Sequence, residues 1–169
     1  YPLTSGINLV TWFVYDPQTQ RGGDGISAPN SGVDLAAIRD GSSNTLAFSE
    51  VRAWTPYLRD SGNPSSRNAP LPAAAAEVIT FGGSFKQNTG HTEWVDGRAH
   101  QTGFTATFPP NHSVPFSSGG RFYDVDFNSS REGKTTDRPT YAAVTSRSYH
   151  SGGVQSLWAD GSVRFVGDS

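Results

Sequence analysis

The segment 150–165 constrains the fold most, because it predicts a β-hairpin at a defined position. Its Asp160-Gly161 pair is a favoured centre for a two-residue turn, since both central positions of a type I′ turn need positive φ. Counting outward from that turn places Trp158 opposite Val163 and puts Phe165 on the same, mostly apolar face. Antiparallel sheets commonly bury one face and solvate the other. We therefore expect Trp158, Val163 and Phe165 to be buried.

Composition favours a turn-rich β protein. The 169 residues include 19 Gly and 11 Pro, which are costly in long helices but suit strands joined by many turns. Aromatic residues make up 12% of the chain, more than a disordered chain of this polarity would carry. We expect a single domain over 1–169, mainly β with few short helices and an antiparallel sheet.

The charge of the chain argues against two classes of partner, and its lack of cysteine rules out disulfide bonds. The formal net charge is −2 without any Lys/Arg run, so neither nucleic acid nor an anionic membrane is an expected partner. The chain has no Cys, so no disulfide holds the fold. No apolar run reaches the roughly 18 residues needed to cross a bilayer, so we expect no membrane contact from this stretch of chain.

The order of apolar runs and turn signals predicts the elements between the termini. Strands are expected at 7–15, 45–55, 78–81 and 141–147, short helices at 33–38 and 73–77, and a loop at 56–72. The Asp96-Gly97 pair predicts a further hairpin over 92–108.

Two ordered motifs resemble a known family. The C-terminal motif is His150, nine residues and Asp160-Gly161, and the internal block Asp40-Gly41-Ser42-Ser43-Asn44-Thr45 is followed by an expected strand and Glu50. Together they resemble the planctomycete-type prepilin-like family that carries a C-terminal His-nine residues-Asp-Gly motif (DUF1559). The stretches 11–16 and 91–98 also resemble segments of its members, so the likeness spans essentially the whole chain.

The resemblance implies a pilin- or pseudopilin-like globular head at the cell surface or outside the cell. Its implied role is that of a non-catalytic structural and assembly subunit of a filament, and its implied partners are other pilin-like subunits or like chains. Family members begin with a basic leader, a prepilin cleavage site and a long apolar helix. This chain opens at Tyr1 and contains no Met, so we expect a processed product, a trimmed piece or an incomplete reading of a longer protein.

Three alternating oxygen-bearing residues form the first candidate metal site. Asp124, Asp126 and Asn128, followed by Glu132, have the ligand type that calcium prefers, although the Gly and spacing of a full calcium-binding loop are missing. A strand with these residues outward and their apolar neighbours inward is the competing interpretation. Apart from calcium in a stabilising role, no cofactor is expected.

His91, Glu93 and His100 form the second candidate. In the expected hairpin around Asp96-Gly97 they share one face and would suit a transition metal. The competing interpretation is that this face is simply solvated, while Trp94 packs on the other. The metal interpretation belongs to an alternative function, an extracellular metal-dependent enzyme; a carbohydrate-binding module with exposed tryptophans is a second form of that alternative.

His150 allows both a catalytic and a structural interpretation. Serines lie beside it and Asp160 follows, but there is no Gly-x-Ser-x-Gly element to present a nucleophile. We expect His150 to tie its loop to a neighbouring group by a hydrogen bond, and no residue to be catalytic. Asp40, Gly41 and Asn44 are expected to form a polar turn that satisfies its own backbone.

Overall fold

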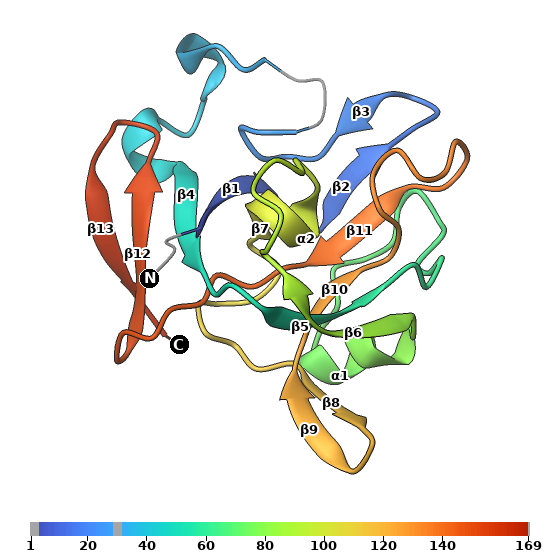
Figure 1. The fold of residues 1–169 in the computed structure, drawn as a ribbon. Helices are drawn as coiled ribbons and strands as arrows, with labels where there is room; N and C mark the ends of the chain where they lie inside the picture. The colour runs from blue at the N-terminus through green and yellow to red at the C-terminus, as the bar shows by residue number, and fades with distance from the viewer. Residues whose placement is uncertain (1–3, 29–31, 169) are drawn as a thin grey trace.

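The computed structural model describes residues 4–28 and 32–168, which form two sheets and a separate hairpin (Figure 1). In spatial order, the first sheet contains β13 (Val163–Gly167), β12 (Gly153–Trp158), β4 (Leu46–Val51), β1 (Thr4–Val10) and β7 (Gly103–Thr105). The second contains β3 (Arg21–Gly22), β2 (Phe13–Asp16), β11 (Thr140–Ala143), β10 (Asp126–Asn128), β5 (Thr55–Arg59) and β6 (Ser84–Gly90). The hairpin pairs β8 (Pro115–Ser118) with β9 (Arg121–Asp124).

The helices are short, so the prediction of a mainly β protein is confirmed. They are α1 (Ala75–Thr80), α2 (Ala99–Thr102) and the 3-10 turns η1 (Leu35–Ala37) and η2 (Ser42–Asn44). The sheets are not purely antiparallel, because β1 pairs with β7 and β5 with β10 in parallel. None of the helices in the described part of the chain has the length and apolar character that crossing a membrane requires.

The strand expected at 7–15 is divided between the two sheets. β1 ends at Val10, and β2 starts at Phe13 in the other sheet. At the break, the Trp12 carbonyl accepts a hydrogen bond from Ala142 N–H at 3.0 Å, and the Trp12 indole is buried. The chain thus changes sheets where its largest side chain enters the core.

That core is aromatic and lies against the second sheet. The Trp12 ring lies 6.0 Å from Phe127 and 5.5 Å from Tyr141, measured between centroids. Leu58 and Val78 complete the contact from β5 and α1. Burying side chains of this size is worth about 1.5–3 kcal/mol each, so this cluster is the main apolar contribution to stability.

Two expected elements are wrong in type. The strand expected at 78–81 is the end of helix α1, which extends the helical turn expected at 73–77 and places Val78 in the core. The loop expected at 56–72 begins within strand β5, whose Leu58 is also buried. In both cases contacts with distant segments outweigh local propensity.

The hairpin expected over 92–108 is also wrong. The Asp96 carboxylate accepts the Arg98 N–H at 3.1 Å, and α2 begins immediately afterwards. The segment closes instead through the His91 N–H, which donates to the His100 carbonyl at 3.0 Å. Trp94, expected to pack, is 81% exposed.

The C-terminal hairpin is confirmed, but its register differs by one residue. Val163 pairs with Leu157 instead of Trp158, because the loop contains three residues, 159–161, of which only Gly161 has positive φ, at 86°. The Asp160 carboxylate accepts the Ser162 N–H at 2.8 Å, which favours a turn ending in one left-handed glycine.

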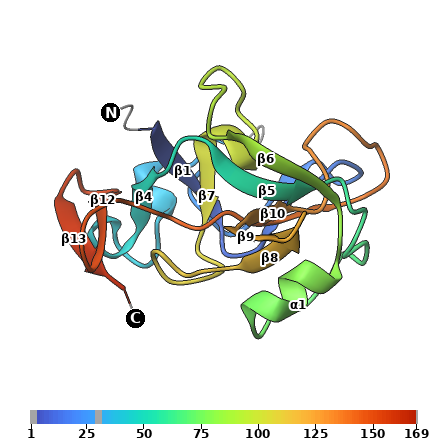
Figure 2. The ribbon, with the colours of Figure 1, turned by 60° about the horizontal axis from the view of Figure 1, so that its bottom comes forward.

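The register shift corrects the predicted burial. Val163 is 65% exposed and Phe165 49% exposed, while Trp158 is only half-buried. The buried positions of this hairpin are on β12, at Val154 and Ser156. Figure 2 shows the hairpin at one side of the molecule, away from α1, with β13 outermost.

Candidate functional site

The internal Asp40-Gly41 block and the C-terminal Asp160-Gly161 turn lie against each other. The backbone N–H of Asp160 donates to the Ser42 carbonyl at 3.1 Å, and the N–H of Ala159 donates to the Thr45 carbonyl at 2.8 Å. The internal block therefore binds the turn of the C-terminal hairpin through its backbone carbonyl groups. Two motifs more than 100 residues apart in the chain act as one structural unit.

The internal block satisfies its own backbone, as expected. The Asn44 side-chain amide donates to the Asp40 carbonyl at 3.0 Å, and the Asn44 N–H donates to the Gly41 carbonyl, also at 3.0 Å. The Thr45 hydroxyl donates to the same Gly41 carbonyl at 3.1 Å. These bonds hold the turn that receives the hairpin.

His150 is bonded to Glu50 and not to Asp160. The His150 Nε2 lies 3.2 Å from Glu50 Oε1, while the second oxygen of Glu50 accepts the Gln155 N–H at 2.8 Å. The nearby Ser148 hydroxyl donates to the Gly153 carbonyl at 2.6 Å and accepts the His150 N–H at 3.0 Å. The geometry joins the loop to β4 and β12, and the hydroxyl is committed to the backbone.

Asp160 has its own local partners. Hydrogen bonds from the hydroxyl and N–H of Ser162 lower the pKa of the Asp160 carboxyl, and Arg164 contributes in the same direction at 3.3 Å. This carboxylate therefore stabilises its own turn as an ionised group.

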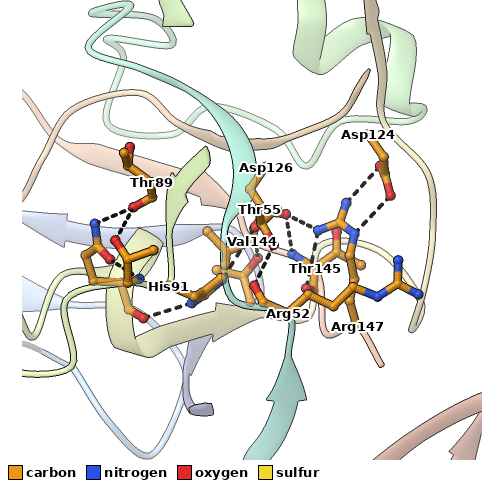
Figure 3. Close-up of polar contacts among 12 residues, drawn as sticks. Arg52, Thr55, Thr89, His91, Asp124, Asp126, Val144, Thr145 and Arg147 are labelled. Carbon is orange, nitrogen blue, oxygen red and sulfur yellow. Dashed lines mark hydrogen bonds and ion pairs between the residues drawn. The ribbon is translucent and has the colours of Figure 1, made fainter. Parts of the chain in front are cut away.

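A buried charge network is centred on Arg147, in the segment that follows β11 (Figure 3). The Arg147 guanidinium contacts Asp126, and it reaches both oxygens of Asp124 at 3.0 and 3.1 Å. The Thr145 N–H donates to Asp126 at 3.1 Å, and His91 Nε2 lies 3.5 Å from the other Asp126 oxygen. The network links β9, β10 and the segment after β11.

The network favours the charged forms of its central pair. Burial alone would raise the pKa of Asp126, but the Arg147 charge and the His91 hydrogen bond outweigh it and lower the pKa. Burial likewise opposes the charge of Arg147, and the two carboxylates outweigh it and raise the Arg147 pKa. A buried pair of this kind is costly to break, because a lone charge would remain in the interior.

The second candidate metal set does not come together as expected. His91 and His100 are buried instead of solvated, whereas Glu93 is exposed. His91 Nδ1 lies 2.8 Å from the Gln101 carbonyl, and the His100 ring stacks on Tyr57 at 5.0 Å between centroids. Burial lowers the pKa of His100 to about 4, so its ring is neutral at pH 7.

The first candidate set is bound within the protein. Arg147 already contacts the carboxylates of Asp124 and Asp126, and a calcium ion there would have to displace it. Asn128, expected to point outward in the strand interpretation, is fully buried. Within residues 4–28 and 32–168, no group of three His, Asp or Glu side chains is placed to hold a metal ion.

Glu132, considered in the sequence only as an oxygen-bearing residue after the candidate calcium ligands, has a local structural role. One of its oxygens accepts the Ala99 N–H at 3.0 Å at the start of α2, and the Asn128 side chain adds a hydrogen bond to this carboxyl. Burial raises the pKa of this carboxyl. Glu132 therefore fixes the segment that replaces the expected hairpin.

The fold is mainly β, and the C-terminal motif contacts the internal block and the strand that follows it. His150 bonds to Glu50, and Asp160 bonds to Ser42. A family model described as a protein of unknown function (DUF1559), SBP_bac_10, matches residues 1–169. The chain belongs to this family. No curated protein and no solved structure matches the chain.

Sequence reasoning did not find the role of Arg147. In the sequence, Arg147 stands out only as a charged residue that directly follows the small and apolar run 141–146. An unpaired cation would be unfavourable in such surroundings, which points to a partner. The partners of Arg147, Asp124 and Asp126, were considered in the sequence only as calcium ligands. The role of Glu50 was equally hidden, because its two partners are about 100 residues away.

Proposed function

We propose that the chain is the head of a surface-displayed, pilin- or pseudopilin-like subunit that acts through contacts with like chains and not through catalysis. One observation carries this proposal: the motif residues are bonded to groups of their own chain, while large apolar side chains remain exposed at the surface. His150 and Asp160 are bonded to their own chain, at Glu50 and Ser162. In this proposal the two motif residues stabilise the fold of the head, and other residues make the contacts with neighbouring subunits.

The exposed apolar residues support a role in contacts. Trp94 and Val95 are 81% and 78% exposed on the loop before α2, and Phe122 is 84% exposed on β9. Single exposed apolar residues are common, but large aromatics are enriched at protein interfaces. Their positions on separate segments favour a subunit with several neighbours.

The arrangement of the titratable groups supports a non-catalytic role. His91 and Asp126 are buried against each other, and Arg147 contacts the Asp126 carboxylate. A general acid or base must reach the substrate proton directly or through one water. The exposed His150 pairs with Glu50, and the Ser148 hydroxyl beside it donates to a backbone carbonyl.

Immunogold labelling of intact cells that produce the protein tests this proposal. Antibodies against residues 1–169 are expected to label unpermeabilised cells in clusters or linear arrays. Labelling that requires permeabilisation would contradict surface display. A purified chain that turns over an ester or glycan, with loss of that activity in His150→Ala at unchanged melting temperature, would contradict the non-catalytic role.

A further inference from the structure

Strand β13 is the outer strand of the first sheet. Among the described strands it pairs only with β12, and it lies at the side of the molecule (Figures 1 and 2). The free edge of such a strand carries N–H and C=O groups that pair readily with another strand.

The alternation of the ladder shows which groups face outward. The Trp158 N–H donates to the Ser162 carbonyl, and the Asp168 N–H donates to the Gly152 carbonyl, both at 2.9 Å. These bonds flank the register of the hairpin, and bonded pairs alternate in an antiparallel ladder. The β13 residues bonded to β12 are therefore Arg164 and Val166, and those directed outward are Val163, Phe165 and Gly167.

The usual protection of an edge strand is missing on β13. Natural edges carry charges, prolines or inward-pointing ionised groups that prevent pairing. The only ionisable residue of β13 is Arg164, whose guanidinium lies over the Trp158 ring at 4.8 Å and bonds to Asp160 at 3.3 Å. The apolar side chains of Val163 and Phe165 are left exposed.

We propose that β13 pairs with β13 of a second copy, antiparallel, about a two-fold axis at Phe165. In this register Phe165 faces its equivalent, and Val163 faces Gly167, which has no side chain to collide with it. The three outward-directed residues form the bonded pairs, so the ladder of the first sheet continues into the second copy. The strand is thus complementary to itself in hydrogen bonding, shape and charge, as a two-fold interface requires.

This inference rests on the proposed function, since both need contacts between like chains. A charge-swap experiment tests the inference separately. By sedimentation velocity, from about 1 μM to about 1 mM, the wild-type chain should dimerise. Phe165→Glu and Phe165→Lys should each raise the dissociation constant about tenfold or more, because like charges then face each other. An equimolar mixture of the two should restore the dimer as a heterodimer.

The matched controls are Thr136→Glu and Thr136→Lys, which introduce the same charges at an exposed position outside β13 and should leave the dimer unchanged. Amide hydrogen exchange of the wild type gives a readout that survives any loss of stability in the variants. Protection of the Phe165 amide should increase with concentration, while that of Arg164 should be high throughout. A wild type that stays monomeric, or a dimer insensitive to both Phe165 changes, overturns the inference. Surface labelling of cells decides the proposed function independently.

Discussion

At the scale of single residues, the buried polar side chains determine how the fold responds to pH. The His100 ring has a pKa of about 4 in the fold and about 6.5 when unfolded. Between these values the unfolded chain binds a proton that the folded chain does not. Stability therefore falls as the pH is lowered through this window, by up to roughly 3 kcal/mol.

Replacing His100 with Phe should flatten that dependence. The substitution keeps a ring against Tyr57 and removes the titrating group. The lowered pKa of Asp126 affects stability in a different pH range, because its contribution to the free energy of unfolding is lost only as the pH falls below about 3.8. Urea unfolding at several pH values measures the effect, with His112→Phe as the control. An unchanged slope between pH 6.5 and 4 in His100→Phe would contradict this assignment.

Arg147 is expected to be the most sensitive charged residue. Arg147→Met leaves Asp126 buried without its main counter-charge, so the free energy of unfolding should fall by about 3–5 kcal/mol. Lys134→Met removes a half-exposed partner of Asp60 and should cost no more than about 1 kcal/mol. Denaturant midpoints of the two variants test the difference, and equal losses would show that the buried network is not special.

At the scale of elements, the C-terminal hairpin depends on a close backbone approach at Gly153. A Cβ at this position would lie 2.2 Å from the Val166 carbonyl oxygen and 2.8 Å from the Phe165 ring. Gly153→Ala should therefore destabilise the protein by about 1–3 kcal/mol. Gly97→Ala, where a Cβ meets nothing within 4 Å, is the control. Thermal unfolding measures both, and a neutral Gly153→Ala would mean that the strands separate more freely than described.

The Asp-Gly pairs at Asp96 and Asp160 show what the sequence could and could not predict. Both were expected to make hairpins, because the dipeptide favours a turn wherever it occurs. At Asp160 it does so, but the bond from Ser162 selects a turn that shifts the register by one residue. At Asp96 the carboxylate binds Arg98 and leads into α2. The dipeptide encodes a turn, while side-chain bonds decide what the turn connects.

Long-range pairing explains the remaining differences. Strand β5 contains Pro56 and was expected to be a loop, yet it pairs in parallel with β10 from far along the chain. The candidate site shows the same limit. The sequence motif drew attention to His150 and Asp160, but it did not show that the partner of His150 is Glu50 on β4, 100 residues earlier. Local pattern identifies such residues, and only the fold identifies their partners.

At the scale of the whole molecule, the exposed apolar side chains are expected to be contact sites between subunits. The chain has no Cys, so a single introduced cysteine can report contacts without background. Trp94 and Phe122 are the most suitable positions, because both are more than four-fifths exposed and lie on different elements. Thr136, also exposed, serves as the control outside these apolar positions.

Cysteine cross-linking in intact producing cells is the most direct test of the central claim that this head works by assembly. With a thiol-specific cross-linker, Trp94→Cys or Phe122→Cys is expected to give a cross-linked dimer, because each chain then carries one thiol, while Thr136→Cys stays monomeric. Monomer alone from both Trp94→Cys and Phe122→Cys, at normal surface amounts of the protein, would contradict the claim.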